Sequence, residues 1–209
     1  MQPHETYALV AHRFYLSKNK NPSTHIFKPE PDEYKGLARN EFLCLDIAEK
    51  LSFSVPKHYL IQKNRQEGLL VERFDRKCVD GIIYPIHAED FCQIAGLADT
   101  RKYQTRSPFS PYFFDGITLF STILLEHGLD CREELAKRCV LSYFLANTDA
   151  HAKNYSILYS ESGLILSPVY DFVSILAQGN FEPYMAMDIG GELNIYKITR
   201  NNYFEFEKK

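Results

Sequence analysis

The pattern of apolar residues changes near residue 75 of this 209-residue chain, and that change limits the possible folds more than any other feature. Before it, apolar side chains recur every three residues from Leu37 to Leu51, which predicts one amphipathic helix. Four runs around this helix are rich in β-forming residues: Thr6–Tyr15, Thr24–Lys28, Ser54–Ile61 and Gly68–Val71. Residues 1–75 are therefore expected to form a small β-rich lobe that contains one helix.

Beyond Asp80 the remaining strong patterns are helical. Helices are expected at His87–Leu97, Asp115–His127 and Arg132–Leu145. The segment Asp99–Phe114 is rich in Arg, Lys, Ser, Pro and Tyr and predicts a surface loop. Residues 76–209 are thus expected to form a second, mainly helical lobe. The predicted fold class is α+β with two lobes.

Composition excludes several classes of protein. A net charge of -3 and a pI near 6.2 give no basic excess, so direct binding to nucleic acid is not expected. Five cysteines without a C-x-x-C pair predict reduced thiols rather than a zinc site or a disulfide framework. No apolar run approaches the length of a membrane span, and no signal peptide is recognisable. The expected location is the cytoplasm.

The strongest functional signal lies in Asn147–Asn154, followed by an expected hairpin over residues 155–166 and then by Asp171. Phosphoryl transfer needs a carboxylate that orients the attacking hydroxyl, and oxygen ligands that hold Mg²⁺ against the phosphates of ATP. The D-x-x-x-x-N spacing of Asp149 and Asn154 is that of the protein kinase catalytic loop. We assign Asp149 to the hydroxyl, and Asn154 and Asp171 to Mg²⁺. Alone, this spacing more often reflects residues that cap a helix or complete a turn.

Two charged residues upstream strengthen this interpretation. Lys28 ends a predicted strand, and Glu41 lies in the first turns of the following helix, where an ion pair would fix the lysine against the phosphates. A single lysine or glutamate is usually a solvated surface charge. The order of strand lysine, helix glutamate, lobe junction, catalytic loop and metal aspartate is what favours a kinase.

Other positions admit two interpretations. The junction Leu69–Arg76, with Glu72, Arg73 and Phe74 at its centre, fits the place where adenine would contact the backbone between two lobes, or an ordinary charged linker. His151 and Lys153 lie next to the expected phosphate position, and either can equally be a structural side chain.

A set of motifs in a fixed order makes the chain resemble the HipA family, the bacterial serine/threonine kinase toxins of toxin–antitoxin systems. The motifs are Thr24–Lys28, Asn40–Glu41, Val71–Arg76, Glu89–Gln93, Asn147–Asn154, Tyr170–Asp171 and Ala186–Gly191.

The resemblance implies a two-lobed protein kinase-like fold and an ATP site. It implies Lys28 on the ATP phosphates, Glu72 to Phe74 at the adenine, Asp149 as the catalytic acid-base, and Asn154 and Asp171 on Mg²⁺. Tyr170, next to Asp171, belongs to the implied site. The resemblance also implies a HipB-like antitoxin partner and an aminoacyl-tRNA synthetase as a protein substrate.

The chain departs from the family pattern at both ends. Family members carry a glycine-rich segment and a Gln-x-Lys element, whereas this chain begins at Met1 and has His4 in place of that lysine. They also continue with further helices beyond Ile189–Gly191. We therefore expect a chain truncated at both ends: a fragment, one subunit of a split toxin completed by a small subunit, or an inactive product.

These departures keep other functions open. The missing glycine-rich loop, which would cradle the triphosphate, favours a non-catalytic, pseudokinase-like module that binds a partner protein. A small-molecule kinase of the aminoglycoside type shares the D-x-x-x-x-N spacing but fits the other motifs poorly.

Overall fold

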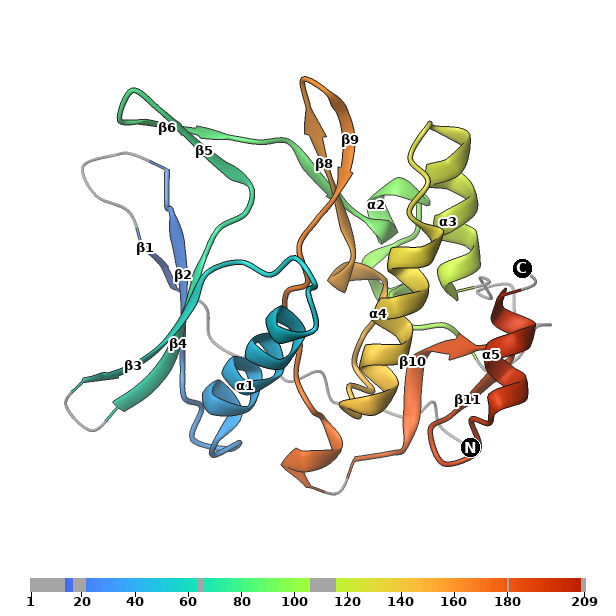
Figure 1. Ribbon diagram of the computed structural model, residues 1–209. Coiled ribbons are helices and arrows are strands. Elements are labelled where there is room, and N and C mark those ends of the chain that lie inside the picture. Colours follow the sequence, from blue (N-terminus) through green and yellow to red (C-terminus); the bar gives the residue numbers. More distant parts are fainter. Residues whose placement is uncertain (1–13, 17–21, 64–65, 106–115, 180, 208–209) are drawn as a thin grey trace.

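The computed structural model describes residues 14–16, 22–63, 66–105, 116–179 and 181–207. A four-stranded antiparallel sheet comes first along the chain, in the spatial order β1-β2-β4-β3. Its strands are β1 (Phe14–Leu16), β2 (His25–Pro29), β3 (His58–Lys63) and β4 (Gln66–Glu72). Helix α1 (Leu37–Lys50) lies beside this sheet, between it and the rest of the molecule (Figure 1).

Helix α1 is held to the sheet by apolar packing. Leu45 and Ala48 on the helix and Leu69 on β4 have no exposed surface, and all three belong to one buried cluster. Burying a leucine side chain contributes about 1.5–3 kcal/mol. The helix is therefore fixed in place relative to β2 and β4, which lie at the centre of the sheet.

The start of α1 is set by two residues that precede it. Gly36 has a φ of 83°, a left-handed backbone that favours glycine, and so turns the chain into the helix. The Glu30 carboxylate accepts hydrogen bonds from the N–H groups of Gly36 and Ala38, the latter at 2.9 Å. These bonds satisfy N–H groups that have no partner within the helix, and they place a negative charge at its positive end.

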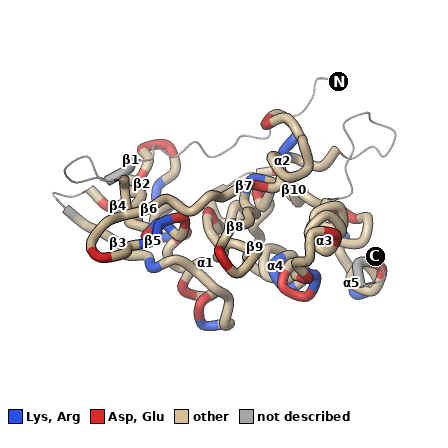
Figure 2. The backbone as a smooth tube through the Cα atoms, turned by 90° about the horizontal axis from the view of Figure 1, so that it is seen from above, with Lys and Arg blue, Asp and Glu red and all other residues tan. Residues whose placement is uncertain are grey.

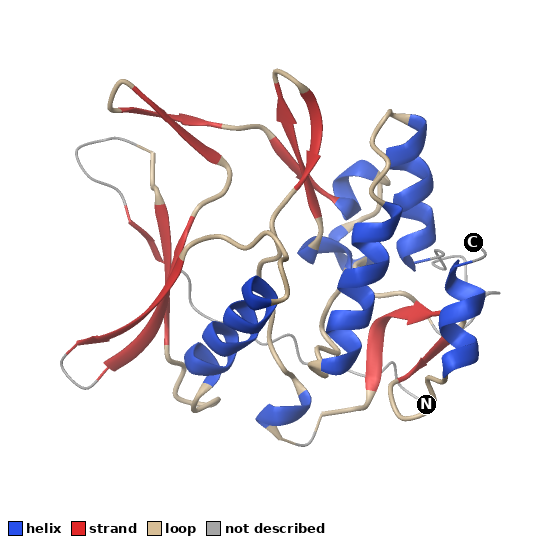
Figure 3. Ribbon diagram, in the orientation of Figure 1, coloured by secondary structure: helices blue, strands red, loops and turns tan. Residues whose placement is uncertain are grey.

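The remaining elements follow β4. One hairpin is formed by β5 (Arg76–Val79) and β6 (Ile82–Pro85), and another by β10 (Tyr184–Ile189) and β11 (Glu192–Asn194). A three-stranded sheet is formed by β7 (Ala88–Asp90), β8 (Ser156–Ser160) and β9 (Gly163–Leu166). The helices are α2 (Phe91–Ile94), α3 (Gly116–Glu126), α4 (Arg132–Phe144) and α5 (Arg200–Glu207). Figure 3 shows these helices together on one side of the molecule and the four-stranded sheet on the other.

A second apolar core lies among these helices. Phe91 at the start of α2 and Phe120 on α3 are fully buried, and their ring centroids lie 4.1 Å apart. Leu135 on α4 and Ile157 on β8 belong to the same cluster. This core therefore ties β8, which leads out of Asn147–Asn154, to the helices on either side.

Several predicted elements are confirmed. The helix predicted at Leu37–Leu51 is α1, those at Asp115–His127 and Arg132–Leu145 are α3 and α4, and the hairpin predicted over residues 155–166 is β8–β9. The strand predicted from Ser54 begins at His58. Residues 6–13, most of the first predicted strand, lie outside the described residues.

The helix predicted at His87–Leu97 is wrong. Ala88–Asp90 instead pair with Ser156–Leu158 of β8, so three residues of the segment are extended. The Asp90 side chain then accepts a hydrogen bond from the N–H of Gln93, and the Gln93 side chain accepts one from the N–H of Asp90. This capping box starts a helix of only four residues, α2. The hairpins β5–β6 and β10–β11 were not predicted from the sequence.

Other expectations concern the whole described chain. All five cysteines are free thiols, and only Cys78 among them is exposed. In the described part of the chain, no helix is long and apolar enough to cross a membrane. Basic and acidic residues are intermixed over the described backbone (Figure 2).

Candidate active site

Lys28 is a buried cation that contacts two carboxylates. It lies on β2 opposite Leu69 of β4, and 8% of its surface is exposed. Its Nζ lies 2.5 Å from Oε1 of Glu41 on α1 and 2.5 Å from Oδ1 of Asp171. A buried charge is tolerated only when it is paired, so this position requires both α1 and the Asp171 segment to be in place.

Asn40, the residue before Glu41 on α1, is hydrogen-bonded to the segment that contains Asp171. The side-chain amide of Asn40 donates to the carbonyl of Ser174 and accepts from its N–H, each at 2.9 Å. Asp171 itself has a φ of 54°, in the left-handed region that is uncommon for residues other than glycine. Such backbone strain persists where surrounding contacts fix it, and it is common at functional sites.

A cavity of about 170 Å³ opens beside Lys28. Seven of the residues singled out from the sequence line it: Lys28, Glu41, Glu72, Arg73, Phe74, Tyr170 and Asp171. The rest of the lining is mostly apolar and comprises Ile26, Leu45, Val71, Asp75 and Ala88. An apolar pocket with a few converging charges is the usual form of a small-molecule site.

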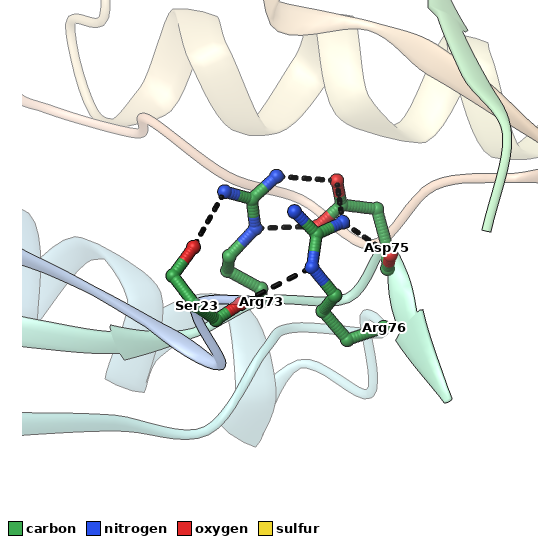
Figure 4. Close-up of polar contacts among 4 residues, drawn as sticks. All are labelled: Ser23, Arg73, Asp75 and Arg76. Atoms are coloured by element: carbon green, nitrogen blue, oxygen red, sulfur yellow. Dashed lines mark hydrogen bonds and ion pairs between the residues drawn. The ribbon is translucent and has the colours of Figure 1, made fainter. Parts of the chain in front are cut away.

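The junction between the sheet and the second half of the chain is held rigid by a polar network (Figure 4). Arg73 donates two hydrogen bonds to the Asp75 carboxylate, at 2.9 and 2.6 Å, and a third to Oγ of Ser23. Arg76 donates to the same carboxylate at 2.8 Å and to the carbonyl of Ser23. Burial raises the pKa of Asp75, but the two arginines outweigh burial and hold it below its ordinary value.

Asp149 lies in the tight loop between α4 and β8. Its N–H donates to Oδ1 of Asn147, and its Oδ1 accepts a 2.6 Å hydrogen bond from the hydroxyl of Tyr103. Burial raises the pKa of Asp149, and the charge of Asp171 adds to the rise. The hydrogen bond from Tyr103 and the charge of Lys102 oppose it. The carboxyl is thus more basic than an exposed aspartate.

Asn154 ends the loop that Asp149 begins. Its Oδ1 accepts a hydrogen bond from the N–H of His151 at 3.0 Å, which closes the loop. Asn154 and Tyr170 also line one small cavity of about 10 Å³, so the end of the loop lies against the wall of the larger cavity. The Tyr170 hydroxyl donates to the carbonyl of Lys153 at 2.8 Å and fixes that contact.

Like Asp149 and Asn154, His151 and Lys153 do not line the larger cavity. Burial and the charge of Lys102 lower the pKa of His151 to about 4, so the ring is neutral at pH 7 and its Nε2 accepts from Nζ of Lys102 at 3.0 Å. Nζ of Lys153 lies 3.0 Å from Asp90 and 2.8 Å from Asp99. Both side chains are therefore used in contacts that hold the loop.

The Mg²⁺ site expected from the sequence has two protein oxygen donors, one from Asn154 and one from Asp171. Among the described residues there is no cluster of three or more His, Cys, Asp or Glu side chains that would hold a metal ion by itself. Mg²⁺ in phosphotransferases is held by one or two protein oxygens together with the phosphates, and it keeps several waters. An amide oxygen and a carboxylate fit that chemistry as donor types, but only Asp171 lines the cavity beside Lys28, and the Asn154 oxygen accepts from the N–H of His151.

Three residues that contact this site were not predicted from the sequence. Asn40 was part of a motif but received no role. Lys102 and Tyr103 fell inside the segment Asp99–Phe114, which was expected to be a surface loop. Their immediate sequence does not indicate these contacts, because the partners are distant along the chain. Asp149 lies 46 positions from Tyr103, and His151 lies 49 positions from Lys102.

Comparison with known proteins identifies the family of this chain. Residues 5–208 match the family model of the HipA-like C-terminal domain. The chain is 31% identical over 202 residues to a putative kinase, Y4mE, of Sinorhizobium fredii, covering 96% of this chain and 47% of that protein. It is 30% identical over 190 residues to the serine/threonine-protein kinase toxin HipA of Shewanella oneidensis, covering 87% and 43%. The chain thus spans about half the length of these curated relatives.

Two solved structures resemble the fold. The Shewanella oneidensis HipA, HipB and operator DNA complex contains a chain that matches all of this one and 53% of itself, with a TM-score of 0.80 and 27% identity. The Helicobacter pylori proinflammatory kinase CtkA matches 86% of this chain and 59% of its own, with a TM-score of 0.56 and 13% identity. The second likeness shows the fold alone, a kinase-like mixture of helix and sheet. With almost its whole length matching one family model, the chain belongs to the HipA-like C-terminal domain family.

Proposed function

We propose that this chain is the nucleotide-binding and phosphotransfer part of an ATP- and Mg²⁺-dependent serine/threonine protein kinase of the HipA type. The observation that carries the proposal is the position of Lys28, buried beside the cavity with Nζ against both Glu41 and Asp171. A lysine so placed presents a fixed positive charge to a phosphate while the helix glutamate holds it.

In this proposal the adenine of ATP enters the cavity at the junction. The N–H groups of Glu72 and Arg73 already donate to the carbonyls of Lys57 and Thr24. No described residue accepts a hydrogen bond from the N–H of Phe74, which leaves that group for the adenine edge. The guanidinium of Arg73 is bound to Asp75, so Arg73 acts through its backbone and through the rigidity of the junction.

The phosphates then lie between Lys28 and Asp171. Mg²⁺ bound by Asp171 and Asn154 would offset the negative charge of the triphosphate during transfer. Asp171 must exchange part of its contact with Lys28 for that metal contact when the nucleotide binds. Asp171 already lines the cavity in which the phosphates would lie.

Asp149 orients the acceptor hydroxyl and takes its proton. The hydroxyl oxygen bonds to the γ-phosphorus, its proton passes to Asp149, and the bond to the β-phosphate oxygen breaks to release ADP. The raised pKa of Asp149 suits it to hold a proton briefly and return it to solvent. His151 and Lys153 support this loop through Lys102, Asp90 and Asp99.

The biological role follows the named relatives. One relative is a kinase toxin called HipA, and one similar structure contains HipB together with HipA and operator DNA. We propose that this chain acts in a toxin–antitoxin system, with a HipB-like antitoxin or a small subunit as its partner. The proposed substrate is an aminoacyl-tRNA synthetase in the cytoplasm. Residues 1–75 would hold the nucleotide, and residues 76–209 would supply the catalytic loop.

A thermal-shift titration with Mg²⁺-ATP tests the nucleotide site. Ligand at about 100 times its Kd stabilises the folded form by about 2.7 kcal/mol, which raises the Tm of a chain of this size by about 5–10 °C. Lys28→Met should abolish the rise. Lys50→Met, which removes an exposed lysine paired with Asp46 on the same helix, should keep it. Equal shifts in both variants, or none in the unsubstituted chain, would contradict the proposal.

A further inference from the structure

Residues 102–104 form a short strap across the catalytic loop. The carbonyl of Lys102 accepts a hydrogen bond from the N–H of Ala152 at 3.0 Å. Nζ of Lys102 contacts Nε2 of His151, and the hydroxyl of Tyr103 donates to Asp149. The strap thus touches the loop at three points between Asp149 and Ala152.

The other side of the strap is anchored to β10. The N–H of Gln104 donates to the carbonyl of Ala186 at 2.9 Å, and its Oε1 accepts from the N–H of Asp188 at 2.8 Å. Gln104 is buried, 9% of its surface being exposed. Because β10 belongs to the second apolar core, the strap is a fixed support rather than a surface loop.

Tyr103 is held in a fixed orientation on this support. Its ring meets the ring of His151 edge-on, at 5.2 Å between centroids and 81° between planes. Burial and the neighbouring Asp149 raise the pKa of Tyr103, so its hydroxyl keeps its proton and is the donor in the 2.6 Å bond. That bond occupies Oδ1 of Asp149. No described residue bonds to Oδ2.

We propose that Tyr103 is the positioning residue for Asp149: its hydroxyl fixes one oxygen of the carboxylate and leaves the other aimed at the acceptor hydroxyl. The inference rests on the proposed function, since it gives Tyr103 a role only if Asp149 takes the acceptor proton. Neither Tyr103 nor Lys102 lines the cavity assigned to the nucleotide.

The test measures ADP release at saturating Mg²⁺-ATP, with water as the acceptor, in Tyr103→Phe. This variant removes only the hydroxyl. We expect a roughly ten-fold fall in turnover with an unchanged Kd for ATP, because misplacing a catalytic group costs rate rather than nucleotide affinity. The matched control is Tyr159→Phe, which removes a tyrosine hydroxyl that also donates to a carboxylate, that of Glu89, away from the site. The control should keep the full rate.

A double-mutant cycle separates positioning from general loss of structure. In an Asp149→Ala background, Tyr103→Phe should cause no further fall in turnover, since the group it positions is gone. A second ten-fold fall there would mean that Tyr103 acts on something else. The same cycle measured by thermal unfolding without nucleotide should also be non-additive. Additive Tm changes would contradict the Tyr103–Asp149 hydrogen bond, whether or not the chain releases ADP.

The outcomes also separate this inference from the proposed function. If Asp149→Ala leaves ADP release unchanged, or the unsubstituted chain releases none, the proposed function fails. The thermal-unfolding cycle then tests the Tyr103–Asp149 hydrogen bond by itself. If Asp149→Ala lowers turnover while Tyr103→Phe does not, the proposed function stands and only the role of Tyr103 is lost.

Discussion

Nζ of Lys28 and Oδ1 of Asp171 lie 2.5 Å apart although 143 positions separate these residues in the sequence. The contact joins β2 of the four-stranded sheet to the segment that follows β9. Glu41 contacts the same Nζ from α1, so three separate segments meet at one buried cation. The nucleotide site proposed here is built around that meeting point.

Lys28→Met should destabilise the protein in the absence of nucleotide. It leaves the buried Glu41 and the partly buried Asp171 near one another without their cation, and removing one member of a buried ion pair costs about 3–5 kcal/mol. Adding Glu41→Gln should recover part of the loss, since one of the two negative charges is then gone. Urea unfolding measures both. A double variant less stable than Lys28→Met would contradict this reading of the cluster.

Phe120→Ala should cost about 3–5 kcal/mol of unfolding free energy, since Phe120 has no exposed surface and packs against Phe91. The matched control is Phe144→Ala at the end of α4, where 74% of the side chain is exposed. That change should stay within about 0.5 kcal/mol. Similar losses in the two variants, measured by chemical denaturation, would show that the core is wrongly described.

Gly190 and Gly191 allow a comparison between neighbouring residues. Both have a positive φ, of 56° and 84°, so alanine at either position costs about 1–2 kcal/mol in backbone strain. A Cβ on Gly190 would also overlap the backbone carbonyl of Asn202 in α5, whereas a Cβ on Gly191 meets no described atom within 4 Å. Gly190→Ala should therefore be clearly the more destabilising in thermal unfolding. Equal Tm losses would exclude the close packing of α5 on this turn.

The Asp75 network should make stability depend on acid pH. Because its folded pKa lies below the ordinary value, the unfolded chain binds more protons at this position, and stability is lost as pH falls from about 4 through the folded pKa. Asp75→Asn removes this contribution. The difference in unfolding free energy between the two proteins should therefore be larger at pH 7 than at pH 3. A difference independent of pH would show that Asp75 stabilises only through neutral contacts.

Local patterns in the sequence predicted much of this fold. The apolar periodicity of Leu37–Leu51 and Arg132–Leu145 sufficed for α1 and α4, because each helix buries one face along its own length. The segment His87–Leu97 was misread because its strand exists only through pairing with β8, nearly 70 residues later. Such pairing leaves no periodicity in so short a run.

The candidate site likewise contains residues that could be predicted from the sequence and residues that could not. Lys28 and Glu41 were expected to meet because strand and helix follow one another, and they do lie in contact. Tyr103 and Lys102 could not be found from the sequence, since their partners lie across the fold and their own segment resembles a loop. Lys153 was expected either beside the phosphates or as a structural side chain, and its ammonium group contacts Asp90 and Asp99.

Phosphate transfer from Mg²⁺-ATP in the Asp149→Asn variant tests the central claim most directly. The variant keeps the size of the side chain and removes its capacity to take a proton. If the chain is a phosphotransferase that uses Asp149, ADP release should fall by roughly 10²-fold or more while the Mg²⁺-ATP thermal shift remains. Unchanged ADP release in the variant, or the absence of any release from the unsubstituted protein despite a thermal shift, would contradict the account.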